Sequence, residues 1–120
     1  MDAKVYGSEG LKSDDILKGA GIAAEGLVIT NVSSGTTDFI ARHKAEYNAE
    51  PGPFAAQGYD AFQALALAIK AGAKTGEEIR AKLDTLEFDG ASGKIKFDER
   101  GDVAGNYDVL VVKDGKFVAE

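Results

Sequence analysis

The chain has 120 residues, of which 44% are hydrophobic and 28% charged, a composition typical of one folded domain rather than of a disordered chain. Fourteen Lys and Arg stand against twenty Asp and Glu, and the resulting net charge of −6 disfavours a nucleic-acid-binding surface. There is no cysteine and a single histidine, His43, so disulfides, zinc fingers and cysteine nucleophiles are excluded.

The N-terminal part is expected to form a strand, a short helix and a second strand. Residues 1–4 lack a basic stretch followed by an apolar run, so we expect no signal peptide. A strand over residues 3–6 leads into a turn at Gly7-Ser8-Glu9-Gly10. Ser13 is typical of a helix N-cap. Residues 26–30 are almost all apolar, which predicts a strand covered on both faces, as in a parallel sheet.

The middle of the chain predicts three consecutive helices. The first covers about residues 38–48 and the second about 54–71, which is apolar on nearly all sides and is therefore expected to be buried on most of them. Thr75 and Glu78 fit a capping box that opens the third helix. No apolar run approaches the ~18 residues of a membrane span.

The last third has the alternation of β-strands. Residues 94–97 predict a strand that leads into a turn at 98–102. Residues 107–112 and 116–118 flank an Asp-Gly pair and predict a hairpin. The expected order is β-α-β-α-α-α-β-β-β, an α/β fold with parallel strands at the front. No strand is expected between 31 and 93, so few strands could cover the three helices.

Glu9 is the first candidate for binding. It follows a strand at the edge where open α/β sheets bind ligands, and its carboxylate suits an ammonium group. The flanking glycines would let a ligand approach the backbone closely. From position alone, a solvated turn glutamate is the better interpretation.

Phe54 is the second candidate. It stands at the expected start of a buried helix, where an aromatic side chain can line a pocket and free backbone N–H groups can receive an anion. From position alone it is better explained as a hydrophobic staple or core residue.

Other chemistry has weaker support. The acidic turn at 98–102 lacks the ligand spacing of an EF-hand, and we expect no metal site. His43 has no second histidine or cysteine with which to form a site, and we interpret it as an ordinary, partly packed residue. No spacing singles out a pair of catalytic carboxylates, so the sequence does not support an enzyme, and no cofactor is expected.

Four segments carry a resemblance to a known family. They read VYGSEGL at 5–11, AEGLVIT at 24–30, PFAAQGYDA at 53–61 and GASGKIKFDERGD at 90–102. In this order, they resemble the C-terminal third of the periplasmic substrate-binding proteins for branched-chain amino acids, of the type I group that serves ABC importers. The resemblance covers essentially all 120 residues.

The resemblance implies how the chain is organised. Members of the family fold as two parallel-sheet lobes with the ligand held between them. By analogy, residues 1–30 and 109–120 are part of the second lobe, and 31–108 are part of the first. Crossings are expected near 31–35 and 105–108. The strands that the helices need would lie in the part of the family fold that this sequence does not match.

The resemblance also implies a site. The family glutamate that matches Glu9 accepts the α-ammonium of the ligand, the aromatic residue that matches Phe54 lies against the ligand, and Tyr6 and Ser8 are neighbours of the site. The family's contacts to the ligand carboxylate come from the unmatched part, so this chain alone is expected to bind weakly or not at all. The implied partners are an amino acid and a membrane permease, and the implied location is the periplasm.

Two alternatives stay open. One is a ligand-sensing module of the same fold in a receptor or regulator. The other is a self-associating piece, natural or engineered, because the apolar helix at 54–71 would invite a partner if it were exposed. In that case the chain forms a homo-oligomer or pairs with the missing N-terminal part.

Overall fold

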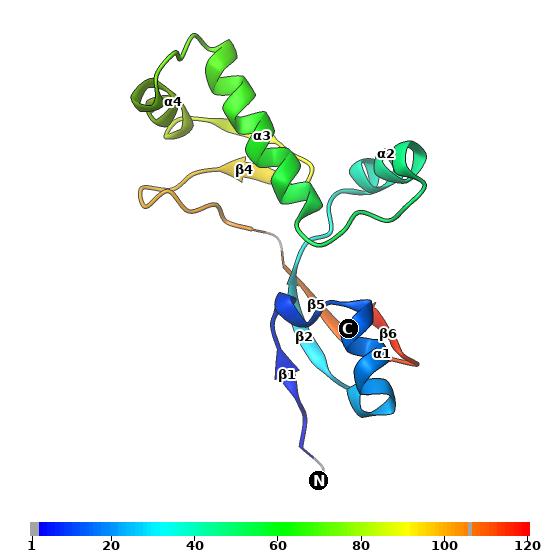
Figure 1. Ribbon diagram of the computed structural model, residues 1–120. Helices are drawn as coiled ribbons and strands as arrows, with labels where there is room; N and C mark the ends of the chain where they lie inside the picture. The colour runs from blue at the N-terminus through cyan, green and yellow to red at the C-terminus, as the bar shows by residue number, and fades with distance from the viewer. Residues whose placement is uncertain (1–2, 106) are drawn as a thin grey trace. The chain divides into compact units, whose positions relative to one another are not determined.

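The computed structural model describes residues 3–105 and 107–120, and the chain divides into two compact units (Figure 1). Unit 1 holds Met1–Val32 and Tyr107–Glu120, and unit 2 holds Ser33–Asn106. Position 106, within the crossing expected at 105–108, lies outside the described residues. Among the described helices, none combines the length and the apolarity that a membrane crossing requires.

Unit 1 is built on a four-stranded mixed sheet in the order β1-β2-β5-β6. β1 and β2 are parallel, with Tyr6 opposite Val28, which confirms the parallel pairing expected at the front of the chain. β5 is antiparallel to both β2 and β6. The expected hairpin is also confirmed, and Asp114 and Gly115 at its turn both have positive φ angles. The strands are β1 (Tyr6–Gly7), β2 (Val28–Val32), β5 (Tyr107–Lys113) and β6 (Lys116–Ala119).

The core of unit 1 covers only one face of β2, the face that carries Ile29 and Asn31. Ile29 is 0% exposed and belongs to a buried cluster with Leu27 and Val112. The strand alternates, because Ile29 and Asn31 are buried whereas Thr30 is exposed. The prediction that this strand is covered on both faces is therefore wrong. Successive side chains point to opposite faces of a sheet, and only one face of β2 has a covering layer.

The helices of unit 1 are short. α1 (Asp14–Ala20) begins after Ser13, whose side chain accepts a hydrogen bond from the Asp15 N–H at 3.2 Å, which confirms the predicted N-cap. α1 ends at Gly21, which has a φ of 54°. Two 3₁₀ helices were not expected from the sequence: η1 (Glu9–Leu11) occupies part of the predicted turn, and η2 (Gly21–Ala24) leads toward β2.

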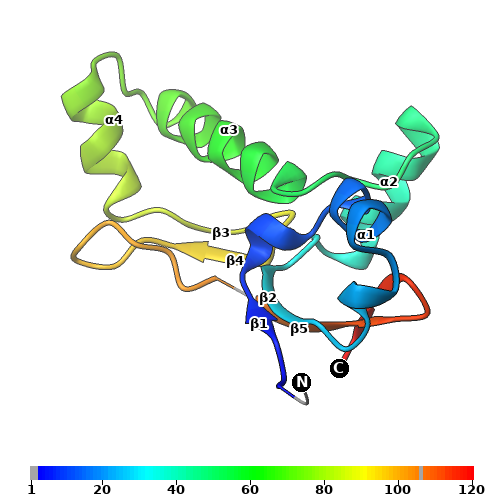
Figure 2. The same ribbon diagram turned by 60° about the horizontal axis from the view of Figure 1, so that its bottom comes forward.

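Unit 2 contains the three predicted helices: α2 (Thr37–Tyr47), α3 (Ala55–Lys70) and α4 (Gly76–Leu83) (Figures 1 and 2). The side chain of Thr36 accepts a hydrogen bond from the Phe39 N–H, so α2 begins slightly earlier than predicted. The capping box of α4 is confirmed, because Thr75 Oγ1 accepts from the Glu78 N–H and Glu78 Oε2 accepts from the Thr75 N–H, both at 3.2 Å.

The strands of unit 2 form a two-stranded antiparallel ribbon. β4 (Lys94–Lys96) is close to the prediction, and it pairs with β3 (Glu87–Asp89). The expectation that no strand lies between 31 and 93 is therefore wrong. Only three residues long, β3 has too few positions for an alternating pattern to be recognised, and its pairing with β4 defines it.

A buried carboxylate ties α3 to the segment that joins β3 and β4. Asp60 is only 4% exposed. Its carboxylate accepts hydrogen bonds from the Ala91 N–H at 2.5 Å, the Ser92 N–H at 2.7 Å and the Ser92 hydroxyl at 2.5 Å. A Cβ atom at Gly90 would lie 2.6 Å from the Asp60 carboxyl carbon, so this close approach requires glycine. We refer to Asp60 and these partners as the Asp60 latch.

α3 is buried along one side only, which corrects the prediction that it is covered on most sides. The buried residues are four apart, and all are small except the aspartate of the latch: Ala56, Asp60, Ala64 and Ala68. Large apolar side chains of the same helix, such as Phe62, are exposed. The composition of the helix predicts that it prefers burial, but which sides are buried depends on the elements that pack against it.

The ribbon of unit 2 carries an ion triad with a predictable pH dependence. Glu87 pairs with Lys94 at 2.5 Å and with Lys96 at 3.3 Å. Hydrogen bonding from Lys94 and then from Lys96 lowers the pKa of Glu87, and Glu87 raises the pKa of Lys94. The contribution of Glu87 to stability is thus present above its unfolded-state pKa and is lost as the pH falls through its lower folded-state pKa. The contribution of Lys94 is lost as the pH rises through its raised folded-state pKa.

We expect Lys94→Gln to move the pKa of Glu87 up toward its ordinary value, and Lys96→Gln to move it by less, because Lys94 is the larger cause. An NMR titration of the Glu87 side chain measures both shifts, with Lys82→Gln on α4 as the control. A larger shift in the Lys96 variant, or no shift in either, would contradict this account. All three side chains are exposed, so salt should weaken the effect.

Candidate functional site

The loop after β1 presents Glu9. The Leu11 N–H donates to the Ser8 carbonyl and the Lys12 N–H donates to the Glu9 carbonyl, both at 3.0 Å, which closes the loop into η1. Because β1 and β2 are parallel, this loop lies at the carboxyl ends of neighbouring strands, where α/β proteins bind ligands. The structure therefore places Glu9 where the sequence predicted it, on a defined turn.

The two glycines beside this loop have different roles. A Cβ atom at Gly7 would come within 2.3 Å of Leu11 Cδ1, so the Leu11 side chain would have to shift to admit a larger residue there. A Cβ atom at Gly10 would meet nothing within 4 Å. The surroundings therefore favour a small residue at position 7 and place no steric demand on position 10.

Glu9 carries a charge that the described part of the chain does not neutralise. Its side chain is partly buried, and none of the described residues forms an ion pair or hydrogen bond with the carboxylate. Tyr6 and Ser8, the neighbours implied by the resemblance, are both exposed. A partly buried carboxylate without a partner is available to a cationic group from outside the chain.

Phe54 has an unusual backbone conformation. It is the N-cap of α3 with φ 63° and ψ 6°, in the left-handed region, and its side chain is 52% exposed. Bulky side chains rarely adopt positive φ, and such strain is concentrated at functional sites. The Phe54 carbonyl accepts a hydrogen bond from the Gly58 N–H at 2.9 Å, so the first turn of α3 helps to hold this conformation. Sequence reasoning singled out the residue but not its backbone.

Gln57, in the first turn of α3, was missed by sequence reasoning. Its side-chain N–H donates to the Ser33 carbonyl at 2.9 Å, which ties α3 to the start of unit 2. Its Oε1 atom is buried and has no hydrogen-bond partner among the described residues. A glutamine early in a helix carries no sequence signal for such a role, because most are exposed.

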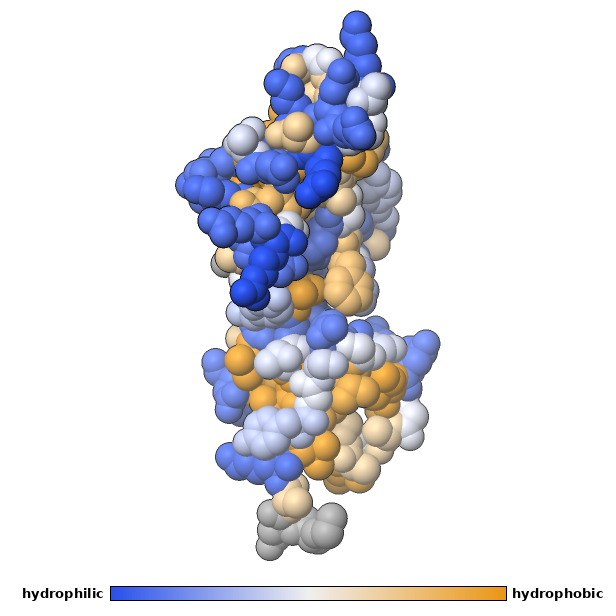
Figure 3. Space-filling view, turned by 90° about the vertical axis from the view of Figure 1, so that its left-hand side faces the viewer, coloured by the Kyte–Doolittle hydropathy of each residue, from blue (hydrophilic) through white to orange (hydrophobic). Residues whose placement is uncertain are grey.

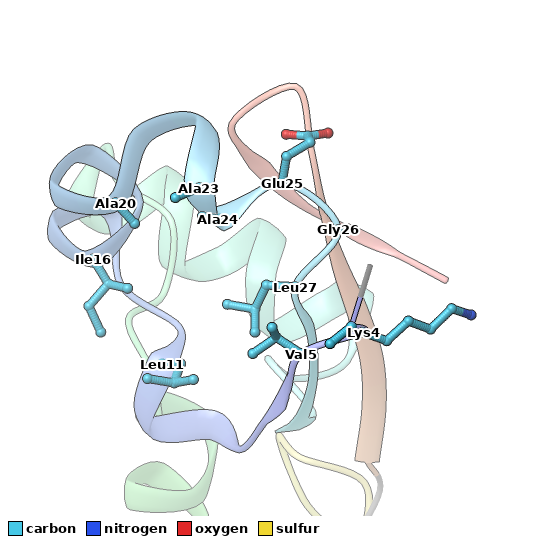
Figure 4. A pocket seen from close by; sticks show the side chains of 11 residues that line it. Lys4, Val5, Leu11, Ile16, Ala20, Ala23, Ala24, Glu25, Gly26 and Leu27 are labelled. Carbon is cyan, nitrogen blue, oxygen red and sulfur yellow. The ribbon is translucent and has the colours of Figure 1, made fainter. Parts of the chain in front are cut away.

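A pocket of unit 1 does not coincide with the predicted site. It has a volume of about 480 Å³ and is lined mainly by apolar side chains, among them Val5, Leu11, Ile16 and Leu27 (Figure 4). The charged ends of Lys4 and Glu25 point away from it (Figure 4). Glu25 instead accepts hydrogen bonds from the Asp114 and Gly115 N–H groups at the hairpin turn. The pocket therefore lacks the polar groups that an amino acid needs.

A second pocket, in unit 2, is aromatic. It measures about 390 Å³ and its lining includes Phe39, His43, Tyr47 and Tyr59. The His43 ring lies 4.8 Å from the Tyr47 ring and 6.0 Å from the Phe39 ring, between ring centroids, and its Nδ1 lies 3.0 Å from the Ala49 carbonyl oxygen. These contacts agree with the interpretation of His43 as a partly packed residue.

Arg42 also lines this pocket, and its charge is already engaged. Its Nε donates to Asp38 at 2.9 Å. A hydrogen bond with Tyr59 and the nearby charge of Asp38 raise the pKa of the Arg42 guanidinium.

The turn at 98–102 is held by its own side chains. The Asp98 carboxylate accepts hydrogen bonds from the Arg100 N–H at 2.8 Å and the Asp102 N–H at 2.9 Å. Gly101 has a φ of 85°. Across residues 3–105 and 107–120 there is no group of three or more His, Cys, Asp or Glu placed to hold a metal ion.

Comparison with known proteins gives a consistent result. Residues 2–116 match the family described as periplasmic binding protein. The leucine-, isoleucine-, valine-, threonine- and alanine-binding protein of Pseudomonas aeruginosa is 32% identical over 117 residues, which are 92% of this chain and 31% of that protein.

Solved structures of similar fold belong to the same kind of protein. The leucine-binding protein LivK of Thermotoga maritima is 31% identical with a TM-score of 0.85, over 100% of this chain and 37% of that one. The branched-chain amino acid transporter substrate-binding protein LivJ of Streptococcus pneumoniae, in complex with isoleucine, is 25% identical with a TM-score of 0.79, over 98% of this chain and 36% of that one. The chain thus spans about a third of the length of each relative.

Proposed function

We propose that this chain, which belongs to the periplasmic binding protein family, contributes to branched-chain amino acid binding in the substrate-binding component of an ABC importer. The observation that carries the proposal is the Glu9 carboxylate, partly buried at the carboxyl end of a parallel strand and unpaired among the described residues. Such a carboxylate binds an α-ammonium through charge-assisted hydrogen bonds. The amino-acid class is supported by the relatives, which include a leucine-binding protein and a branched-chain amino acid transporter substrate-binding protein.

Phe54 supplies an apolar contact to the ligand in this proposal. Its exposed ring and left-handed backbone at the N-cap of α3 support this role. Tyr6 and Ser8, exposed on either side of Gly7, are assigned as neighbours of the ammonium site. In this proposal the chain takes part in binding the ligand and catalyses no reaction.

Unit 1 is proposed to be part of the second lobe of the family fold, and unit 2 part of the first. The support is the division of the chain after Val32 and before Tyr107, close to the limits that the resemblance implied.

The proposed partners are an amino acid and a membrane permease, and the proposed location is the periplasm. A sensing module of the same fold would use the same ligand contacts, and transport by a reconstituted permease would separate the two functions.

Binding by this chain alone is expected to be weak. An amino acid in contact with Glu9 still has to bury its carboxylate, and an unpaired buried charged group costs at least about 1–3 kcal/mol. The resemblance places the groups that contact this carboxylate in the part of the family fold that the chain does not match. We therefore expect millimolar or weaker binding, and micromolar binding of leucine, isoleucine or valine in a calorimetric titration would contradict this expectation.

Replacing Glu9 with glutamine tests the proposal. We expect the variant to bind leucine about tenfold to a hundredfold more weakly, because a hydrogen bond to a charged group contributes about 1.5–3 kcal/mol. NMR titration to tens of millimolar leucine, followed at the Gly7 and Gly10 amides, measures the change. The leucine analogue that lacks the amino group, 4-methylpentanoate, should cause no shift at these amides.

Glu99→Gln, in an exposed turn of unit 2, is the matched control and should leave leucine binding unchanged. Equal shifts with leucine and 4-methylpentanoate would contradict recognition of the ammonium by Glu9. Leucine-dependent shifts elsewhere in the chain without shifts at either glycine would show that this loop is not the site.

A further inference from the structure

The sheet of unit 1 ends in an open edge at β6 (Figure 1). β5 lies on one side of β6, and no described strand pairs with its other side. An edge of this kind presents backbone N–H and C=O groups that can pair with another chain. Apolar side chains are open to solvent on both units (Figure 3), so they do not by themselves single out a contact surface.

The backbone groups that face outward from β6 belong to Phe117 and Ala119. The Glu120 N–H donates to the Val109 carbonyl at 3.0 Å, so these two residues form a hydrogen-bonded pair of the ladder. Hydrogen-bonded and non-hydrogen-bonded pairs alternate along antiparallel strands. The backbone groups of Val118 therefore point toward β5, whereas those of Phe117 and Ala119 point away from it.

The side chains of β6 are complementary to a second, antiparallel copy of the same strand. Lys116 and Glu120 lie two residues before and two residues after Val118, and all three side chains are exposed. If two copies pair around Val118, each Lys116 lies opposite the Glu120 of the other copy. Opposite charges in facing positions stabilise an antiparallel pair. In the same register Phe117 lies opposite Ala119, so the outward N–H and C=O groups of the two copies can bond to each other.

The neighbouring registers are less favourable. Pairing around Phe117 would bring Glu120 opposite Asp114, and like charges in facing positions are destabilising. Pairing around Ala119 would bring Glu120 opposite Val118 and leave the charge of Glu120 without its lysine. A lysine on a sheet edge normally discourages pairing, and only the register around Val118 gives Lys116 a facing carboxylate.

We propose that β6 pairs with β6 of a second copy of this chain, antiparallel and centred on Val118, to form a symmetric dimer. Both copies use the same surface, so the contact closes as a dimer. The net charge of −6 on each copy opposes association, but charges more than about 10 Å apart are largely screened at about 0.1 M salt. The dimer does not depend on ligand binding by Glu9, nor on the helix at 54–71, which the sequence indicated as a surface for self-association.

Charge reversal tests the register directly. Lys116→Glu and Glu120→Lys should each weaken self-association by about tenfold or more, because both facing ion pairs become like-charged pairs. An equimolar mixture of the two variants should associate again, since every facing pair is then opposite in charge. Sedimentation equilibrium, measured up to millimolar protein, gives the dissociation constants.

Lys82→Glu and Glu99→Lys are the matched controls, because they make the same changes in net charge at exposed positions of unit 2. Each should leave the dissociation constant within about twofold of the unmodified chain. Ala119→Pro removes an outward N–H while leaving the hydrogen bonds to β5 in place, and it should also weaken the dimer.

The proposal is overturned if the unmodified chain stays monomeric at millimolar concentration. It is also overturned if a dimer forms that neither single reversal weakens, which would assign self-association to another surface. A mixture of Lys116→Glu and Glu120→Lys that fails to associate would equally contradict the register around Val118.

Discussion

Replacing Asp60 with asparagine is expected to lower the free energy of unfolding of unit 2 by roughly 3 kcal/mol. The carboxylate receives hydrogen bonds at both oxygens: Oδ1 accepts from the Ala91 N–H, and Oδ2 accepts from both the N–H and the hydroxyl of Ser92. An asparagine of the same shape keeps one acceptor oxygen and turns the other into an NH₂ donor. The Ser92 N–H would then face a donor and stay unsatisfied in a part-buried position.

Two other variants show whether the loss of stability comes from the Asp60 latch or from an Asp-to-Asn change as such. Gly90→Ala should be destabilising as well, because its Cβ atom would lie 2.6–2.7 Å from the Asp60 carboxyl group. Asp84→Asn on the exposed end of α4 makes the same chemical change without a latch and should be neutral within about 0.5 kcal/mol.

Denaturant unfolding gives the stability, and hydrogen exchange at the Ala91 and Ser92 amides reports the latch itself. Unchanged protection of these amides in Asp60→Asn would refute the assigned role. So would a loss of stability in Asp84→Asn as large as that in Asp60→Asn.

The Asp60 latch also illustrates what sequence reasoning could not supply. An aspartate in an apolar helix has no local signature of burial, because its three donors come from residues more than 30 positions later in the chain. β3 was missed for the same reason, since three residues become a strand only by pairing with β4. Features that depend on partners distant in sequence are therefore the ones that local patterns miss.

Most features that depend on neighbours in sequence were predicted, the two short 3₁₀ helices excepted. The cap at Ser13, the capping box of Thr75 and Glu78, and the hairpin turn at Asp114 and Gly115 all involve residues within a few positions of each other. Their geometry is set by local hydrogen bonds and backbone preferences.

The candidate site was only partly predictable. The position of Glu9 after a strand could be read from the sequence, but the absence of a partner among the described residues could not. The left-handed backbone of Phe54 could not be anticipated, because aromatic residues disfavour it and only the surrounding structure can hold it there. The exposure of large apolar side chains of α3, such as Phe62, likewise depends on which elements pack against the helix.

Replacing Ile29 with alanine is expected to destabilise unit 1 by about 2–5 kcal/mol, the usual range for a large-to-small change in a core. Ile29, the second residue of β2, is fully buried and lies in register with Gly7 of β1 and Leu110 of β5. Removing three carbon atoms there leaves a cavity on the covered face of the sheet, where Ile29 packs in the core of unit 1, and strand pairing fixes the backbone, so the neighbours can close it only in part.

Ile22→Ala is the matched control, because it makes the same chemical change in the same unit at a side chain that is 93% exposed, and it should change stability by less than about 0.5 kcal/mol. The cavity also lies under the Glu9 loop, since a Cβ atom at Gly7 would lie 3.5 Å from Ile29 Cγ2. Amide exchange should therefore accelerate at Gly7 in Ile29→Ala and stay unchanged in Ile22→Ala. If Ile29→Ala lost stability but Gly7 kept its protection, β2 would stabilise the core without holding the loop that presents Glu9.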